Sequence, residues 1–584
     1  MFFRFVLVCA LVTGLGACGD NHKGVADAGA PGDAMMADTG PAPDAPLEGF
    51  TAPDIVCPGG PGCATDGDGV LKVGASAHAY TPMNFETYTD ENNDKQWESD
   101  EPYTDLNGNG KFDGVWLFGG GRAAEGVTTD VEARALAFVE GDTTVVIVYI
   151  DCIGLLAGDM DAIRNHPMLA GLDIDHIIIG ATHAHDAPDT VGLWGPSPTS
   201  TGREDFVIQA LYDAAAASIY DAVTTARPAH MVIASTKLLN DPNDPLSRTD
   251  MWNGDFRDPV IFDPTLTIAR FVDATDEDTT IGTLVNWADH PEVAHFSQTD
   301  PAQVTAHYPH WLRESIEQGV TTSESIFAQQ DLAGLGGVTV FVQGAVGGQV
   351  GSLTTRNIHP PGPDGTPITV ESNAEDEAIG KNVAARALTV LRDDGETVTS
   401  LPLSMVSAKY NARIDNTLFQ LAFLVHLLGP HDLVGYNPDE PLDDTNAPWM
   451  PMRATYLQIG PLGIETVPGE LHPELWVGGY DGSWTWGWVF NDDTKPNQPD
   501  FAHVPQPPYM RDLVLAHSGV RYPVLAGLAE DYCGYIVPAY NYALDPGDPY
   551  INEADGDHYE EVYSLGPDDE RHVVDPILQL LQYH

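Results

Sequence analysis

The chain has 584 residues, of which 43% are hydrophobic, so it is long enough to bury one large core or two ordinary ones. Its formal net charge of -60 repels the phosphates of nucleic acid and argues against a nucleic-acid partner, whereas it suits a protein that binds cations. Beyond the first 20 residues the cysteines are Cys57, Cys63, Cys152 and Cys533, and none has the C-x-x-C spacing of a structural zinc site. Cys57 and Cys63 are close enough for a small disulfide loop outside the cytoplasm, while the sequence leaves the pairing of the other two open.

The first 48 residues are typical of an exported lipoprotein. Arg4 is the only charge among the first 19 residues, and the apolar run Phe5–Ala17 has the length of a signal peptide and is too short to span a bilayer. The run ends in Leu-Gly-Ala followed by Cys18, which resembles the bacterial lipoprotein signal box, where the Cys bears the lipid. We expect a signal peptide over residues 1–18, a flexible Ala/Gly/Pro/Asp tether over 19–48, and an anchor in the bacterial cell envelope, at the outer membrane or cell surface. A soluble secreted product is the alternative.

An acidic insert at about 89–116 has the spacing of two calcium loops. Positions 1, 3, 5, 7 and 12 of the first loop are Asp90, Asn92, Asp94, Gln96 and Glu101, and positions 1, 3, 5, 7 and 9 of the second are Asp105, Asn107, Asn109, Lys111 and Asp113, with Gln96 and Lys111 ligating through the backbone. Lys95 replaces the usual Gly at position 6 of the first loop. Trp116 stands at position 12 of the second, which therefore needs a ligand from elsewhere. We expect Ca²⁺ in a structural role; the alternative is a solvated acidic loop.

Buried apolar strands alternate with amphipathic helices in the rest of the chain, which predicts layered α/β structure. Strands are expected at Ala133–Val139, Thr144–Ile150, His176–Ile179, Ile281–Trp287, Val338–Val342 and Leu457–Thr466. Helices are expected at Asp205–Ala226, Val304–Glu317, Ala374–Leu391 and Val574–Gln582. We therefore expect residues 49–584 to form a single large catalytic domain of mixed β-sheets with flanking helices.

Three of the expected strands end just before side chains that bind metals. His183 and His185 follow the first of these strands, His290 follows the second, and Glu470 follows the third. In layered α/β structures the strand ends on one edge converge on a site. Two imidazoles and a carboxylate are the ligand set of a catalytic zinc that keeps one position open, so the spacing predicts a zinc site built from His183, His290 and Glu470.

Other segments could bind an anion or a metal. The glycine-rich turn Gly344–Ser352 could hold a phosphate or an oxyanion with its backbone N–H groups, although it lacks the Lys-Ser/Thr ending of a nucleotide P-loop. Arg248 and Arg257 could hold a carboxylate, a phosphate or an oxyanion, or form ordinary ion pairs. His307 and His310, three residues apart in an expected helix, are a competing metal pair.

A series of motifs, kept in order along the chain, resembles the neutral/alkaline non-lysosomal ceramidase family. They are T-H-x-H-x-x-P at Thr182–Pro188, W-x-x-H within Asn286–His290, V-P-G-E at Val467–Glu470, G-Y-[IV] at Gly534–Ile536 and Tyr-Glu…Leu-Gly-Pro at Tyr559–Pro567. The resemblance implies a zinc ion held by His183, His290, Glu470 and Tyr535. It also implies that His185 assists the zinc-bound water or steadies the tetrahedral intermediate.

The chain departs from the family pattern in two places. The family's glycine-rich turn carries a Ser implicated in catalysis, and the corresponding position here falls at about Val350, so Ser352 is the candidate hydroxyl. The family's C-terminal immunoglobulin-like domain is not expected. These departures call ceramide itself into question as the substrate.

We therefore expect a zinc-dependent amidohydrolase that acts on a small-molecule or lipid N-acyl substrate such as an N-acyl sphingosine. A water molecule activated by Zn²⁺ would attack the carbonyl, His185 would shuttle the proton to the leaving nitrogen, and Arg257 or the glycine turn would hold the oxyanion. A metal-dependent esterase or phosphoesterase is the alternative enzyme. The alternative without catalysis is a tethered, calcium-rigidified surface protein that binds a partner or glycan.

Overall fold

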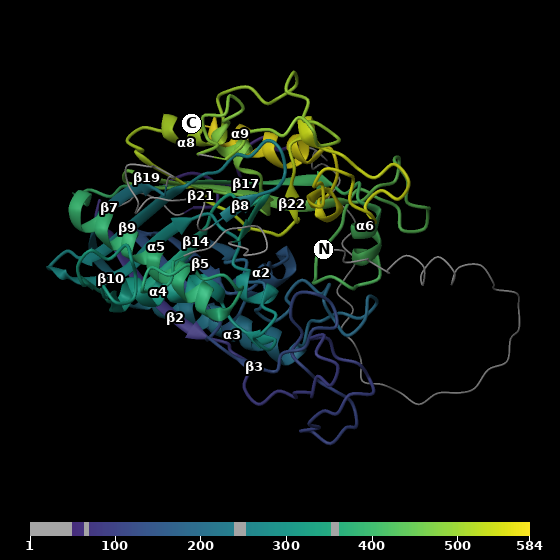
Figure 1. The fold of residues 1–584 in the computed structure, drawn as a ribbon. Coiled ribbons are helices and arrows are strands. Elements are labelled where there is room, and N and C mark those ends of the chain that lie inside the picture. Colours follow the sequence, from purple (N-terminus) through teal and green to yellow (C-terminus); the bar gives the residue numbers. More distant parts are fainter. Residues whose placement is uncertain (1–48, 64–68, 239–252, 352–360, 487, 584) are drawn as a thin grey trace, which may run out of the picture.

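The computed structural model describes residues 49–63, 69–238, 253–351, 361–486 and 488–583. These residues form four layers, in which two β-sheets pack face to face and helices cover the outer face of each sheet (Figure 1). The prediction of one large α/β domain with mixed sheets and flanking helices is confirmed. Cys18, the tether at 19–48, Arg248 and Ser352 lie outside the described residues.

The larger sheet has nine strands. Their order is β14 (Val338–Gln343), β10 (Asp276–Trp287), β9 (Thr265–Asp273), β7 (Arg227–Lys237), β2 (Leu71–Ala79), β4 (Glu132–Glu140), β5 (Thr143–Ile150) and β6 (His176–Ala181), with β16 (Glu396–Val398) paired to β7. The β5–β6 and β10–β14 pairs are parallel, and the other pairs are antiparallel. Because both faces are covered, central strands are apolar throughout: all residues of β5 (TTVVIVYI) are buried.

The larger sheet curls until its two edge strands approach each other. The side-chain N–H of Gln343, the last residue of β14, donates to the Thr182 carbonyl at 3.1 Å, one residue past β6. The segment that follows β21 fills the remaining gap: Gly527 N donates to Gln343 O at 2.9 Å, and Ala181 N donates to Leu528 O at 3.0 Å. The ends of β6, β10 and β14 therefore meet at one place, although β6 and β14 are at opposite ends of the strand order.

The smaller sheet has five strands, in the order β1 (Ile55–Cys57), β17 (Leu403–Arg413), β18 (Trp449–Ile459), β19 (Leu462–Thr466) and β21 (Tyr522–Ala526). Its inner face shares an apolar core with the larger sheet, to which Phe271 and Leu457 contribute. The expectation of one strand over Leu457–Thr466 is wrong. A turn at Gly460, whose φ is 56°, divides this apolar run into the antiparallel pair β18–β19.

Two groups of helices complete the layers. On the larger sheet lie α2 (Ala157–Arg164), α3 (Asp205–Thr224), α4 (His307–Gln318) and α5 (Asn373–Asp394), and on the smaller sheet lie α6 (Thr417–Leu424), α7 (Pro473–Val477), α8 (Met510–Ala516) and α9 (Asp575–Leu581) (Figure 1). The four helices expected from the sequence are present within a few residues of their expected bounds. None of the helices in the described part of the chain has both the length and the apolar character that a membrane crossing requires.

Short elements connect the layers. Two-stranded ribbons are formed by β3 (Gly126–Val127) with β11 (Gln303–Val304), β12 (Gly319–Val320) with β13 (Leu332–Ala333), β15 (Gln349–Gly351) with β8 (Asn253–Asp255), and β20 (Glu470–Leu471) with β22 (Tyr535–Ile536). Short helical turns occupy Pro167–Leu169, Val293–Phe296, Ala539–Asn541, Glu560–Tyr563 and Glu570–Val574. The parallel pairing of β20 with β22 brings the Glu470 segment beside the aromatic stretch that contains Tyr535.

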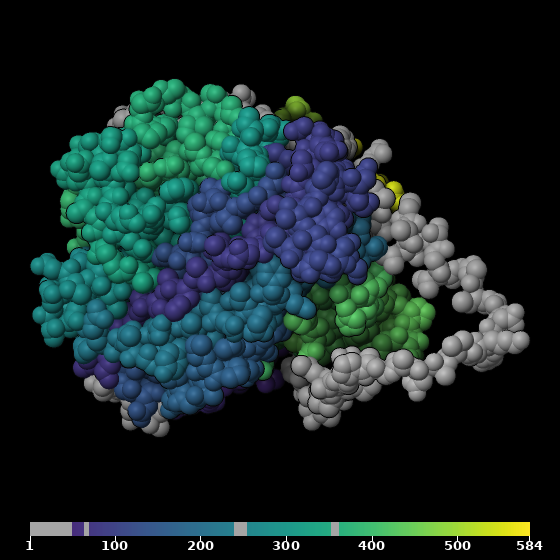
Figure 2. All heavy atoms as spheres, turned by 90° about the horizontal axis from the view of Figure 1, so that it is seen from below, coloured from purple at the N-terminus to yellow at the C-terminus, as the bar shows by residue number. Residues whose placement is uncertain are grey.

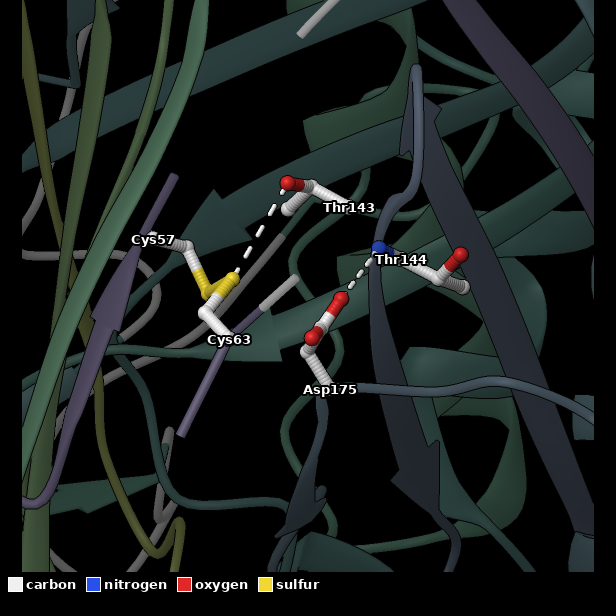
Figure 3. Close-up of a disulfide and its surroundings, with 5 residues drawn as sticks. All are labelled: Cys57, Cys63, Thr143, Thr144 and Asp175. Atoms are coloured by element: carbon white, nitrogen blue, oxygen red, sulfur yellow. Dashed lines mark hydrogen bonds between the residues drawn. A yellow bond between two sulfur atoms is a disulfide. The ribbon is translucent and has the colours of Figure 1, made fainter. Parts of the chain in front are cut away.

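Cys57 and Cys63 form a disulfide, as expected, at the start of the domain (Figure 3). The Cys63 sulfur lies 3.9 Å from Thr143 Oγ1 at the start of β5. The neighbouring Asp175 carboxylate accepts a hydrogen bond from the backbone N–H of Thr144. Because both sulfurs are bonded to each other, they are not thiolates and do not offer a metal site with Asp175. Cys152 and Cys533 are buried and are not bonded to each other.

The acidic insert folds around an aromatic cluster of its own. Tyr88 and Trp116 are buried there against Trp97, Tyr103 and Phe112. In the space-filling view this part of the chain appears as one blue-purple block at the surface (Figure 2). The insert is therefore a compact lobe with its own small core, placed on the side of the larger sheet.

Candidate metal centre

His183, His290 and Glu470 stand just past three buried strands, and their side chains meet. His183 Nε2 lies 3.1 Å from His290 Nε2 and 3.3 Å from Glu470 Oε2, and His290 Nε2 lies 3.2 Å from the same carboxylate oxygen. The three residues are at most 2% exposed. The structure therefore brings together the three residues that were selected because they follow strand ends. Their potential metal-ligating atoms form a closed triangle.

The hydrogen bonds around His183 fit a cation at the centre of this triangle. Its Nδ1 lies 2.7 Å from the Ile153 carbonyl, so in the neutral imidazole Nδ1 carries the proton and Nε2 presents a lone pair. That lone pair faces Glu470 Oε2, which is also an acceptor, and two acceptors this close repel each other unless a proton or a metal ion lies between them. Ligands about 2.1 Å from a tetrahedral ion are about 3.4 Å apart, close to the spacing of these atoms.

The backbone and the charge of these residues fit the same interpretation. His183 has a φ of 71°, a strained conformation of the kind that persists at functional sites. Burial raises the pKa of Glu470, but His183 and His290 outweigh it and hold that pKa well below its ordinary value. Burial lowers the pKa of His290, but the hydrogen bond to Glu470 gives a net rise, so metal binding at His290 has to displace a proton. Glu470 is thus an ionised carboxylate, the form that binds a metal.

His185 adjoins the triangle, and its ring centroid is 4.8 Å from that of His183, the same distance as between His183 and His290. Its Nε2 is 3.2 Å from His183 Nε2, and suitable atoms of His183, His185 and His290 all lie within 4.8 Å of one another, so the three imidazoles could hold a metal. Its ring centroid is 5.5 Å from that of His290, compared with 4.8 Å between His183 and His290. Burial, with smaller contributions from His183 and His290, lowers the pKa of His185 well below its ordinary value, so this imidazole is neutral.

Two tyrosines of one aromatic stretch approach the site differently. Tyr535, the residue implied by the resemblance, stacks on His290 with ring centroids 6.5 Å apart, and its hydroxyl is hydrogen-bonded to Tyr559. The hydroxyl of Tyr532 donates to Glu470 Oε1 at 2.9 Å. Sequence reasoning missed Tyr532; the available signal was a second tyrosine three residues before Tyr535.

The glycine-rich turn supports the backbone of the site. The N–H groups of its glycines that have a known acceptor bind within the protein, so these groups do not hold an anion. The N–H groups of Gly344, Gly347 and Gly351 donate to acceptors within the protein at 2.9–3.1 Å. A Cβ on Gly347 would lie 2.7 Å from the Glu470 carbonyl oxygen, so glycine permits close packing against the chain that carries the carboxylate. Val350, at the position of the family's Ser, is buried.

Arg257 belongs to a buried ion-pair network in which both terminal nitrogens of its guanidinium are used. Its Nη1 and Nη2 donate to the two oxygens of Glu561 at 2.9 and 2.8 Å, and Nη1 also donates to Glu560 at 3.1 Å. The side chain is 3% exposed. The expectation that Arg257 holds the oxyanion is therefore corrected: its guanidinium stabilises two buried carboxylates.

The competing pair His307 and His310 does not form a metal site. Nδ1 of His307 lies 2.8 Å from Asp376, and its Nε2 accepts from the Asp186 backbone N–H at 3.0 Å. Both ring nitrogens of His307 are thus used in the fold. The ring is committed to holding the Asp186 segment, which follows directly after His185.

The two acidic loops share one backbone conformation. Positions 4 and 6 have positive φ in both loops, with 61° and 64° at Asn93 and Lys95 and 74° and 73° at Gly108 and Gly110. Lys95 thus adopts the conformation for which calcium loops ordinarily use Gly. At positions 3 and 5 of each loop, the side-chain oxygen accepts a hydrogen bond from the backbone N–H two residues further along the chain. The residues that accept are Asn92, Asp94, Asn107 and Asn109.

The structure also supplies a carboxylate for the second loop, whose twelfth residue, Trp116, has none. In the first loop Glu101 accepts from the N–H groups of positions 2 and 9, at 2.9 and 3.0 Å. Glu86, which precedes both loops, accepts from the same two positions of the second loop, at 2.8 and 2.9 Å. Asp90 and Asp105 likewise accept from positions 4 and 6 of their own loops. Glu86 is a residue that spacing within the loop could not reveal.

The layered fold is similar to that of neutral ceramidase. The crystal structure of neutral ceramidase from Pseudomonas aeruginosa is similar to this chain with a TM-score of 0.56 and 16% sequence identity, over 88% of this chain and 74% of that chain. A ceramidase complexed with C2 is similar with a TM-score of 0.53 and 13% identity, over 88% of this chain and 75% of that chain. No sequence model of a protein family and no curated protein matches the chain. At these identities the likeness shows the fold.

Proposed function

We propose that this protein is a metal-dependent hydrolase that cleaves the amide bond of an N-acyl substrate, with zinc held by His183, His290 and Glu470. The observation that carries the proposal is the closed triangle of two imidazole nitrogens and one carboxylate oxygen, 3.1–3.3 Å apart and buried. The resemblance implies Tyr535 as a further ligand; its ring lies beside that of His290, and its hydroxyl is hydrogen-bonded to Tyr559.

The residues of the site divide the work of hydrolysis. A zinc ion bound here would supply Lewis acidity toward the carbonyl and would lower the pKa of a water molecule to about 7. The neutral imidazole of His185, beside this triangle, takes a proton from the attacking water and gives it to the leaving nitrogen. Tyr532 holds one oxygen of Glu470, so the other oxygen stays directed at the two histidines.

The fold supports a lipid N-acyl compound as the substrate class, because the similar structures are ceramidases. The test is hydrolysis of a panel of N-acyl sphingosines, N-acyl alkylamines, carboxylic esters and phosphodiesters, before chelation, after chelation and after zinc is restored. We expect amide cleavage that disappears with the metal and returns with zinc. Cleavage of esters or phosphodiesters alone, or amide cleavage by the His183→Ala protein, would contradict the proposal.

We further propose that the acidic insert binds Ca²⁺ and stiffens the lobe beside the site. The shared conformation of the two loops and the placement of Glu86 support this role. We also propose that the protein is exported and lipid-anchored through Cys18. The disulfide between Cys57 and Cys63 supports an oxidising compartment for the domain.

A further inference from the structure

A row of rings leads from the metal site toward solvent. Phe118 packs on His185 with ring centroids 4.5 Å apart, and it also contacts Trp194 at 4.8 Å and His295 at 5.0 Å. Phe296 extends the row from His295 at 4.9 Å. We name Phe118, Trp194, His295 and Phe296 the aromatic strip. Phe118, Trp194 and Phe296 are partly exposed, whereas the side chains of His185 and His295 are 6% and 7% exposed, so the strip runs from the buried site toward the surface.

Two loops that carry site residues also contribute to the aromatic strip, and a third segment supplies Phe118. Trp194 lies on the loop that carries His183 and His185, and His295 lies in the short helical turn after His290. Phe118 comes from the end of the acidic insert. The strip therefore has the same framework as the proposed zinc ligands.

The Phe118 turn is held in place on both sides. Leu117 N donates to Arg122 O at 2.9 Å, and Gly121 N donates to Gly195 O at 2.9 Å. A Cβ on Gly119, whose φ is 116°, would lie 3.2 Å from the His295 ring. This close approach fixes Phe118 against the His185 side of the site.

The aromatic strip is mostly apolar. Its imidazole, that of His295, directs Nδ1 toward Asp186 at 3.3 Å, and Asp186 is in turn paired with Arg122. The charges behind the strip are thus compensated, and apart from the indole N–H of Trp194 the other three rings present carbon. Such surface gains free energy when a hydrocarbon covers it.

We propose that the aromatic strip binds a hydrocarbon chain of the substrate, and that Phe118 determines the preference for a long chain over a short one. This inference rests on the proposed function and adds a specificity residue to it. The chain belongs either to the acyl group or to the amine, and both sources present the same methylene surface to the rings.

The test compares two series of N-acyl alkylamines, one with a growing acyl chain and one with a growing amine chain. In the wild-type protein, kcat/KM rises with chain length in at least one series. In the Phe118→Ala protein the ratio of kcat/KM for the longest to the shortest substrate of that series falls about tenfold, mainly through KM. The series that loses its length dependence identifies the source of the chain. An unchanged ratio in both series overturns the inference.

A binding measurement keeps the inference testable if none of the amides is cleaved, a result that would count against the proposed function alone. Octanoate and octylamine are titrated into the protein by calorimetry, with butyrate and butylamine as short partners. Weaker binding of one long ligand, about tenfold, in both Phe118→Ala and Trp194→Ala supports the inference. Equal binding in all proteins overturns it. Phe118→Leu, which keeps an apolar side chain, retains most of the affinity, and Phe501→Ala, which removes a surface ring that packs on Phe490, is the matched control.

Discussion

The hydroxyl of Tyr532 donates to Oε1 of Glu470, while Oε2 of the same carboxylate faces His183 and His290. The tyrosine thus fixes the rotation of a carboxylate that could otherwise turn away from the two imidazoles. Residues that orient a metal ligand in this way affect metal affinity although they do not touch the metal.

Replacing Tyr532 by Phe removes this hydrogen bond, so we expect zinc affinity to fall about tenfold or more. Affinity is measured by competition with a chromophoric chelator. Tyr540→Phe is the matched control, because it removes a similar buried bond from a tyrosine to a carboxylate, at 3.1 Å, but the carboxylate is that of Glu474. Equal losses of zinc affinity in the two variants would show that Tyr532→Phe acts through a general loss of stability and not through the orientation of Glu470.

His185→Ala separates proton transfer from metal binding. Because the proposed zinc ligands are His183, His290 and Glu470, we expect this variant to keep its zinc and to lose about 10²–10⁴ in kcat. Metal content and turnover are measured on the same sample. Loss of zinc from this variant would instead make His185 a metal ligand, as its distance of 3.2 Å from His183 also permits.

Glu86→Gln tests the second calcium loop. We expect calcium stoichiometry to fall from two ions to one, because Glu86 supplies the carboxylate that the loop itself lacks. Glu101→Gln has the same effect on the first loop, whereas Glu91→Gln, at an exposed position, leaves the stoichiometry unchanged. Two ions bound by the Glu86→Gln protein in calorimetric titration would contradict the assignment.

Glu530 predicts how stability depends on pH. Burial raises its pKa, but His176 and Arg164 outweigh this and hold the pKa at about 2, below the ordinary value of 4.5. Because the folded-state pKa is depressed, the stabilisation is fully present above about pH 4.5 and is lost as the pH falls toward 2. We expect Glu530→Gln to be less stable by about 3 kcal/mol at pH 7, since it removes the buried carboxylate that pairs with both Arg164 and His176, and to have a weaker pH dependence below 4.5. Parallel pH curves from urea denaturation of the two proteins would contradict this.

Much of the framework could be predicted because it depends on local patterns. The apolar runs before His183, His290 and Glu470 predict buried strands. The first two strand ends converge because the larger sheet curls, whereas Glu470 follows β19 of the smaller sheet. The turn at Gly460 did have a local signal, the Gly460-Pro461 step, which the expectation of one continuous strand overlooked.

Contacts between distant residues could not be predicted in the same way. Arg257 meets Glu561, and Glu86 meets the second acidic loop, through the tertiary fold alone. Tyr532 and Tyr535 lie in one irregular stretch, so the sequence does not say which hydroxyl faces Glu470. The aromatic strip is likewise made from three separate loops.

The zinc content of the purified protein tests the central claim most directly. After reconstitution with zinc and desalting, the wild-type protein should hold one tightly bound zinc ion per chain, as measured by inductively coupled plasma mass spectrometry. The His183→Ala and Glu470→Ala proteins should hold almost none, while His503→Ala, which changes an exposed histidine, should match the wild type. A folded wild-type protein without zinc, or full zinc content in His183→Ala and Glu470→Ala, would contradict the account.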